Sequence, residues 1–492
     1  MEYGGESTDD KGEALGGDNN IDGLKPFFEP RSIAIIGTSR TPGKGGYNII
    51  ENLLRLKYTG GIYPVNPRAE EILGLKVYSS LAELPEIPEL ALIVLPPDRV
   101  LAAFRECIER GIKAVIIESA GFGEMDAPGA AMQDQISQMA HRQRVRVMGP
   151  NSVGTINPYH NLDTSLGRLN VTFLPDDGIK PGPVGLIGQT GLFTGVYLPL
   201  INAEFGASKI ACLGNKCDVD ESDMLAYLGA DPATRFIGMY LESINDGRRF
   251  LEISRRIIPE KPIVVIKSAV TENGAGVSVS HTGSIAGEDR VYDAAFRQVG
   301  ISRVASFEQL WDVMRAFVLL PLPAGNRVGI INLSGSGCVT SVDACTRNGL
   351  QITALSPATR EAIRTVYPDW WQVRSPVDVW TAIEASGFEA TFTTVTRALL
   401  ADEGVDAVIV ITGAIDWMPG KEVATLLADL KNKYSGKPLM AVTPLGDRGI
   451  FLQMHREFLA RGIPNYACDA DAISSLATLS RYQEFRKNLT SA

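Results

Sequence analysis

The chain has 492 residues, of which 45% are apolar and 21% charged, and its formal net charge is −10. This length exceeds that of one ordinary hydrophobic core and indicates roughly three domains, and the composition is typical of a soluble globular protein. The acidic balance argues against nucleic acid and membrane surfaces as partners, because phosphate backbones and anionic lipids attract basic proteins.

The cysteine pattern and the N-terminal residues indicate in which cellular compartment the protein is expected. Six cysteines are spread along the chain without a CxxC pair, and so long a chain needs no disulfides, which favours a reducing cytoplasm. No histidine cluster lies near the closest pair, Cys212 and Cys217, so we predict no metal site. Residues 1–22 are acidic and glycine-rich and lack the apolar segment of a signal peptide. We expect a disordered tail at 1–22 and a cytoplasmic protein.

From residue 31 onward, short apolar runs alternate with helix-period stretches, which is the pattern of a parallel sheet buried on both faces. The first run, 32–36, is followed by a glycine-rich loop at 37–46 and by a helix-period stretch from Tyr47 to Leu56. Further strands are predicted at 61–65, 91–95, 114–117 and 145–148. We assign residues 23–155 to this first domain.

Two more series of the same kind follow. The second has strands near 184–187, 210–213, 236–241 and 263–266, and the third has strands near 328–332, 407–411, 439–442 and 464–467. The proline-rich stretch 320–323 between them is typical of a linker. The predicted fold is therefore α/β, with three consecutive doubly wound parallel-sheet domains, a Rossmann-like domain followed by flavodoxin-like domains at 156–320 and 321–492.

The loop at 37–46 has the features of a site for a ligand with several phosphates. It lies beyond the carboxyl end of a strand, where loop amides and helix N-termini favour anions. Arg40 and Lys44 add two cations, which suits coenzyme A. The glycines do not follow GxGxxG spacing, and the end of the second strand, where a dinucleotide site wants an acidic residue, reads Pro64-Val65-Asn66-Pro67-Arg68, which argues against NAD. The alternative is a tight strand-to-helix connection without a ligand.

Among the four histidines, only His281 lies between small residues typical of loops, in the string SHTGSIAGED at 280–289. An imidazole nitrogen is largely unprotonated near neutral pH and can attack a phosphoryl group. Most single histidines in loops are only solvated side chains, so the residues alone leave both interpretations open.

Three strings together carry a family resemblance. SHTGSIAGED, GNKCDVDESD at 214–223 and GPNSVGTINP at 149–158 resemble the ADP-forming acyl-CoA synthetases, relatives of succinyl-CoA synthetase, and the similarity runs from about Pro26 to Arg486. It implies that His281 carries a phosphoryl group between two active sites and that Glu242 orients its ring. The alternative for Glu242 is a surface glutamate at a strand end.

The resemblance also implies the residues that contact substrates. For coenzyme A these are Gly37, Thr38, Ser39, Arg40, Lys44, Arg68, Pro96, Pro97 and Ser119. Two helix N-termini would embrace the phosphate, after the turns that contain Gln189, Thr190 and Gly191, and Gly335, Ser336 and Gly337. Asn151 would contact the substrate.

No segment resembles the ATP-grasp domain that binds nucleotide in this family, so the resemblance implies a separate ATP-grasp β subunit that holds ATP or ADP with Mg. In the implied reaction, acyl-CoA and phosphate interconvert with acyl phosphate and coenzyme A. His281 then takes the phosphoryl group and ADP accepts it. The substrates are a small carboxylic acid or acyl-CoA and phosphate.

Two alternatives from other classes stay open. The family usually has a cysteine after GPN and an SQSG turn, whereas this chain has Ser152 and Gly188–Gly191, which keeps a non-catalytic regulatory or scaffold subunit that binds coenzyme A under consideration. A dinucleotide-dependent oxidoreductase is the second. The acid is not evident from the sequence, because Trp370, Trp371 and Trp380 line a pocket for a bulky acid or simply pack in a core.

Overall fold

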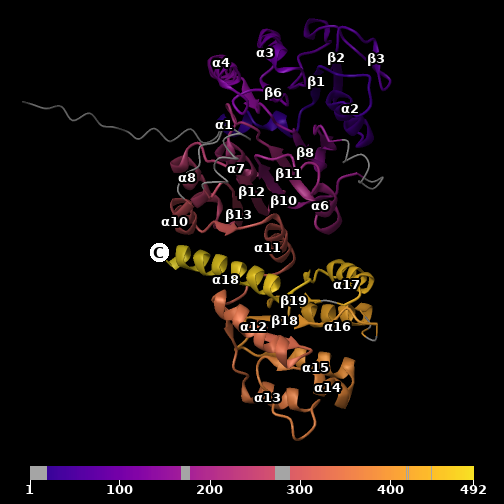
Figure 1. Cartoon of the computed structure of the whole chain (residues 1–492), viewed down its shortest axis with the longest axis vertical. Coiled ribbons are helices and arrows are strands. Elements are labelled where there is room, and N and C mark those ends of the chain that lie inside the picture. The colour runs from indigo at the N-terminus through magenta and orange to yellow at the C-terminus, as the bar shows by residue number, and fades with distance from the viewer. Residues whose placement is uncertain are drawn as a thin grey trace, which may run out of the picture.

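The computed structural model describes residues 19–167, 178–271, 289–416, 418, 420–444 and 446–491. Three sheets follow one another along the chain, each flanked by helices (Figure 1). Both faces of these sheets are buried: in the strand at 32–36, Ile33 and Ile35 belong to one apolar cluster and Ala34 and Ile36 to another. The predicted α/β class with consecutive parallel-sheet units is confirmed.

The first sheet has the order β2-β1-β5-β6-β7, and all its neighbouring strands are parallel. Its segment contains α1 (Asn19–Asp22), η1 (Lys25–Phe27), β1 (Ser32–Ile36), α2 (Gly45–Arg55), β2 (Gly61–Val65), β3 (Glu71–Ile72), β4 (Leu75–Lys76), η2 (Leu81–Glu83), β5 (Leu90–Ile93), α3 (Pro97–Arg110), β6 (Ala114–Ile117), α4 (Ala127–Gln143) and β7 (Arg146–Met148). Residues 19–22, expected in a disordered tail, form α1, and residues 1–18 lie outside the described part.

The second sheet has the order β14-β13-β12-β10-β11-β8-β9. Its elements are β8 (Thr155–Asn157), η3 (Pro158–His160), β9 (Leu162–Asp163), β10 (Pro181–Gly188), α6 (Leu198–Glu204), β11 (Ala207–Cys212), α7 (Glu221–Ala230), β12 (Phe236–Leu241), α8 (Gly247–Ile257), β13 (Ile263–Lys267), α10 (Asp289–Val299), β14 (Ser302–Val304) and α11 (Phe307–Leu319). Five strands are parallel, while β8 and β9 extend the sheet as an antiparallel edge that the sequence did not predict.

The third sheet has the order β16-β15-β18-β19-β20, with β17 paired to β15. Its elements are β15 (Arg327–Asn332), α12 (Gly335–Arg347), β16 (Gln351–Ile352), α13 (Pro357–Arg364), β17 (Val377–Asp378), α14 (Trp380–Ser386), α15 (Phe388–Ala401), β18 (Ala407–Ile411), α16 (Gly420–Lys433), β19 (Leu439–Val442), α17 (Arg448–Ala460), β20 (Asn465–Tyr466) and α18 (Asp469–Ser491). All its strand pairs are parallel.

The last helix ties the third unit to the second. The long helix α18 packs against α11, between the second and third sheets in Figure 1. Tyr482 on α18 donates a hydrogen bond to Ile258 O at 2.7 Å. A buried Arg315 on α11 pairs with Glu204 on α6 at 2.9 Å, and His455 of α17 lies 3.7 Å from the same carboxylate. No helix of the described residues is both long and apolar enough to cross a bilayer.

Candidate functional site

The loops after β1 and β2 meet at the carboxyl edge of the first sheet. The Asn66 side-chain amide donates to Thr38 O at 2.6 Å, and the Gly37 N–H donates to Val65 O at 3.2 Å. The residue after β2 is thus an asparagine whose amide holds the Thr38 loop, so this position offers no carboxylate to the ribose of a dinucleotide. Arg68, predicted to contact coenzyme A, is exposed beside this loop, its N–H donating to Asn66 Oδ1 at 2.8 Å.

The loops after β5 and β6 lie at the same edge. The Ser119 hydroxyl donates to Leu95 O at 2.5 Å and accepts from Leu95 N at 3.2 Å. This pair of bonds fixes the position of Pro96, the N-cap residue, and of Pro97, the first residue of α3. The structure therefore brings Gly37, Thr38, Pro96, Pro97 and Ser119 to one edge, as expected of strands in a parallel sheet.

Two glycines keep the first loop close to its neighbours. Gly37 has φ +93°, and a Cβ there would lie 2.3 Å from Val94 O. A Cβ at Gly46 would lie 2.8 Å from Thr38 Cα. Any side chain at either position would push the loop away from β5 or from the start of α2, so these positions require glycine.

Coenzyme A fits the chemistry of this edge. Neither α2 nor α3 has a side-chain cap at its N-terminus. Pro97 has no N–H, and Tyr47 and Arg99 donate theirs to Lys44 O and Pro96 O. Among the described residues, the N–H groups of Gly45, Gly46 and Asp98 are therefore the ones left for an anion. Arg40 and Lys44 are exposed beside them, and Ser39 Oγ accepts from Thr41 N at 3.0 Å, which shapes the loop. Uncapped helix ends and exposed cations suit a ligand that carries several phosphates.

The loop 149–152 connects this edge to the carboxyl edge of the second sheet. Asn151 has φ +58°, and its N–H donates to Ser119 O at 2.9 Å. The next residue, Ser152, donates its hydroxyl to Cys212 O at 2.6 Å, at the end of β11. A Cβ at Gly214 would lie 2.1 Å from Pro150 O, so the two loops are in close contact. Asn151, predicted to contact the substrate, thus lies between the two edges.

Gln189 joins two loops of the second sheet. Its Oε1 accepts from the backbone N–H of Glu242 at 2.8 Å and of Ser243 at 3.1 Å. The side chain is 3% exposed, and its Nε2 has no hydrogen-bond partner within the described ranges. A buried amide nitrogen without an acceptor is costly in a folded protein, so Gln189 retains two donors for a further acceptor.

Glu242 lies where the sequence placed it, at the end of β12, and is 3% exposed. The Tyr240 hydroxyl donates to its carboxylate at 3.4 Å. Lys267 donates to the backbone carbonyl of Glu242 at 2.7 Å and to Ser268 O at 2.6 Å, and burial lowers the pKa of Lys267 to about 8. The buried position rules out the alternative of an ordinary surface glutamate.

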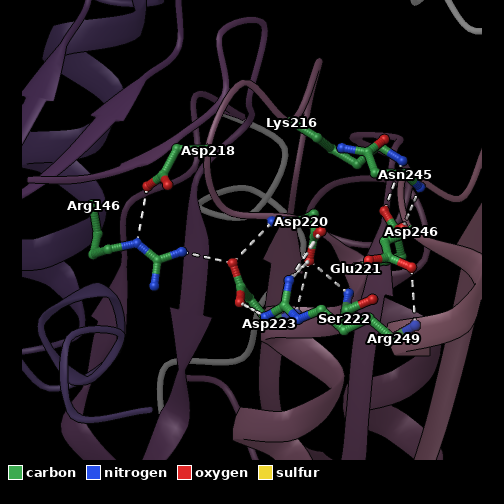
Figure 2. A network of polar contacts seen from close by, with 10 residues as sticks. All are labelled: Arg146, Lys216, Asp218, Asp220, Glu221, Ser222, Asp223, Asn245, Asp246 and Arg249. Atoms are coloured by element: carbon green, nitrogen blue, oxygen red, sulfur yellow. Dashed lines mark hydrogen bonds and ion pairs between the residues drawn. The ribbon is translucent and has the colours of Figure 1, made fainter. Parts of the chain in front are cut away.

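Lysine, serine and acidic residues of the string GNKCDVDESD belong to the polar network drawn in Figure 2. Lys216 has φ +58°, and its ammonium donates to Glu221 Oε2 at 2.7 Å and to Ser243 O at 2.9 Å. Glu221 Oε1 accepts from Asn245 N at 2.7 Å. The Lys216 and Glu221 side chains are almost completely buried, so this pair holds the loop after β11 against the loop that begins at Glu242.

The acidic residues of the same string bind arginines. Arg146 on β7 pairs with Asp218 at 2.9 Å and with Asp223 at 2.6 Å, and Arg249 on α8 also pairs with Asp223 (Figure 2). Asp220 caps α7 in a capping box with Asp223. Asp218 and Asp223 therefore hold β7 of the first sheet against the second unit, and Asp220 is occupied by the cap of α7 and by Arg249.

The predicted phosphate-binding turns differ from each other. After Gln189, Thr190 and Gly191 the α-helix begins only at Leu198, so no α-helix starts at this turn, contrary to the expectation. Helix α12 does begin at Gly335, but Ser334 Oγ already accepts the Gly337 N–H at 3.1 Å, which leaves the N–H groups of Gly335 and Ser336. Within the described ranges, no hydrogen bond or ion pair joins this turn to Gln189 or Glu242. His281 lies outside the described residues.

Sequence reasoning missed a buried acid, Glu118, between β6 and Ser119. Its carboxyl is 4% exposed, and neither oxygen has a hydrogen-bond partner in the described part of the chain. Burial, followed by the nearby charge of Asp163, raises the pKa of Glu118 well above its ordinary value. An acidic residue directly after a four-residue apolar run was the available signal.

We expect Glu118→Gln to stabilise the protein at pH 8 and to have less effect at pH 5. In the unfolded chain this carboxyl ionises above its ordinary pKa of 4.5, whereas in the folded protein burial raises its pKa, so that it ionises only at higher pH. The free energy of unfolding of the wild-type protein therefore falls as pH rises from the pKa of this carboxyl in the unfolded chain to its pKa in the folded protein. The fall is up to about 1.4 kcal/mol per pH unit. Thermal unfolding of both proteins at the two pH values measures this, and an equal difference at both would contradict it.

Comparisons with known proteins agree with this geometry. Residues 31–158 match the model of a CoA binding domain, and residues 181–317 match that of a succinyl-CoA ligase like flavodoxin domain. The chain is 38% identical to acetate–CoA ligase [ADP-forming] II of Archaeoglobus fulgidus over 96% of its own length and 69% of the relative. It is 35% identical to the α subunit of acetate–CoA ligase [ADP-forming] II of Pyrococcus furiosus, covering 93% of this chain and 97% of that one.

A solved structure shows the same overall arrangement. Acetyl-coenzyme A synthetase 1 of Candidatus Korarchaeum cryptofilum, in complex with phosphate and ADP, superposes with a TM-score of 0.83 at 30% identity. The match covers 95% of this chain and 98% of that one, so it includes all three sheets.

Proposed function

Because the chain belongs to the ADP-forming acyl-CoA synthetases, we propose that it is the subunit that binds coenzyme A and passes the phosphoryl group through His281. In this reaction acyl-CoA and phosphate give acyl phosphate and coenzyme A, His281 takes the phosphoryl group, and ADP accepts it. Each step is reversible, and the concentrations of the reactants set its direction.

The main support for this proposal is that the carboxyl edges of the first and second sheets lie next to each other. The loop 149–152 is hydrogen-bonded to Ser119 on the first sheet and to Cys212 on the second. Coenzyme A bound at the uncapped helices α2 and α3 therefore has its site beside the edge that holds Gln189 and Glu242. Acyl transfer needs such proximity between the thiol and the site where acyl phosphate forms.

The residues of the second edge have distinct roles in the proposal. The two donors left on Gln189 suit a phosphate oxygen, because amide N–H groups stabilise anions in a site that excludes water. The Glu242 carboxylate accepts the N–H of the His281 ring and thereby directs the other ring nitrogen to phosphorus. Lys267 and Gln189 hold the backbone of Glu242 in place.

The nucleotide belongs to a separate ATP-grasp β subunit in this proposal. The relative named as an α subunit is matched along nearly its whole length, whereas the Archaeoglobus ligase extends well beyond the match. The partner would hold ATP or ADP with Mg, and a small carboxylic acid and phosphate complete the substrates. This makes a catalytic role a better account than a regulatory or scaffold subunit.

Formation of acetyl-CoA by the chain together with an ATP-grasp β subunit tests the proposal. We expect Arg40→Gln and Lys44→Gln each to raise the KM for coenzyme A about tenfold with kcat unchanged, because each removes a charge-assisted contact to phosphate. Arg142→Gln, an exposed cation on α4, is the matched control and should leave the KM unchanged. Failure to form acyl-CoA from any acid in a panel would instead support the regulatory subunit.

A further inference from the structure

The third unit contains an open cleft on the side of β16, with a volume of about 1000 Å³. Its walls come from α12, from α13, and from the segment 369–375 that leads to β17. In Figure 1, α13 lies at the bottom of the molecule, at the end farthest from the first sheet. Val342, which lines the cleft, is seven residues past the start of α12, so the cleft is about 10 Å along the helix from the Gly335 turn.

Three arginines give this cleft a positive charge. Arg360, Arg364 and Arg374 line it together with a single carboxylate, Asp369, and none of the three forms an ion pair within the described ranges. Arg360 donates to Leu355 O at 3.3 Å and Arg374 to Gln372 Oε1 at 3.1 Å. These neutral acceptors orient the guanidinium groups without cancelling their charge. In a chain with a net charge of −10, such a cleft attracts anions.

The same cleft contains an exposed aromatic surface. Trp370 is 73% exposed, which is unusual for the largest apolar side chain. Its ring meets Trp371 edge to face at 5.6 Å, and Trp371 stacks on Tyr367 at 6.0 Å. Trp371 and Tyr367 therefore support the Trp370 ring, whose surface is largely exposed to solvent. Ser375, also in the cleft wall, has a buried hydroxyl without a partner in the described part of the chain.

We propose that this cleft binds a small anion that carries a flat ring, at a site separate from phosphoryl transfer. The guanidinium groups pair with the anionic group in planar, two-pronged contacts, and the indole of Trp370 stacks on the ring. Aryl carboxylates and nucleoside monophosphates share this chemistry.

Calorimetric titration of the chain alone tests the proposal, since it needs neither the β subunit nor His281. The probes are benzoate, phenyl phosphate and adenosine monophosphate as flat anions, cyclohexanecarboxylate as an anion without a flat ring, and benzyl alcohol as a neutral ring. We expect at least one flat anion to bind, and the two controls to bind at least about tenfold more weakly. The flat anion that binds most tightly distinguishes an aryl acid from a nucleotide.

Substitutions then locate the binding. Arg364→Gln and Trp370→Leu should each weaken binding of the flat anion about tenfold, whereas Arg347→Gln, an exposed cation of α12 outside the cleft, should not. Adenosine monophosphate bound at the first sheet would be insensitive to both cleft substitutions. The proposal is overturned if no flat anion binds at millimolar concentration or if the two cleft substitutions leave its affinity unchanged. It is also overturned if either control probe binds as tightly as the flat anion.

Discussion

Glu242→Gln is expected to slow phosphorylation of the chain by the β subunit and ATP by about 10²- to 10³-fold. The carboxylate is buried at the end of β12, where Gln189 and Lys267 fix its backbone. An amide of the same shape lacks the negative charge that, in the proposed mechanism, accepts the imidazole N–H and favours the phosphorylated ring. Rapid-quench measurement of the phosphorylated chain gives the rate directly.

Tyr240→Phe is the matched control for this substitution. It removes the 3.4 Å hydrogen bond to Glu242 and leaves the carboxylate in place, so we expect a change of less than about threefold. The dissociation constant for coenzyme A should be the same in both variants, because that site lies on the first sheet. A Glu242→Gln variant that is phosphorylated at the wild-type rate would exclude the proposed role of this carboxylate.

Lys216→Met should lower the free energy of unfolding by about 3–5 kcal/mol, since it leaves one member of a buried ion pair without its partner. Glu221 is completely buried, and the Lys216 ammonium forms an ion pair with its carboxylate and also donates to Ser243 O. Denaturant unfolding followed by circular dichroism measures the loss. The positive φ of Lys216 is retained in the variant, so backbone strain contributes equally to both proteins.

The double variant Lys216→Met and Glu221→Gln separates the charge from the packing. Glutamine keeps an oxygen for the Asn245 N–H but carries no charge to be left unpaired, so the double variant should recover at least half of the loss. A loss below about 1 kcal/mol in Lys216→Met would mean that the pair does not determine the stability of this loop.

The long buried strands were predictable because their two faces pack in different apolar clusters, which produces an uninterrupted apolar run. The run at 407–411 shows this: Val408 and Val410 pack in one cluster and Ile409 in another. Strands such as β16 and β17 have only two residues each and give no such run. The antiparallel edge β8–β9 was missed because its pairing with β11 depends on contacts distant in sequence.

The candidate site was predictable in outline and not in its internal contacts. The rule that ligands bind beyond the carboxyl ends of parallel strands placed the loops at Gly37 and Gln189 correctly at those edges. Which side chain reaches from one loop to the next depends on the distance between the loops in the folded protein. The bonds from Gln189 to Glu242 and from Lys216 to Ser243 therefore have no local signal. Glu118 was missed because a strand-end acid is ordinarily exposed.

Transfer of label from ATP to one histidine tests the central claim most directly. The chain, its ATP-grasp β subunit and ATP labelled in the γ-phosphate are mixed, and the acid-labile label on the chain is mapped. We predict that it lies on His281, that His281→Ala abolishes it together with acyl-CoA formation, and that His141→Ala, an exposed histidine on α4, changes neither. Acyl-CoA formation at the wild-type rate by His281→Ala would contradict the account.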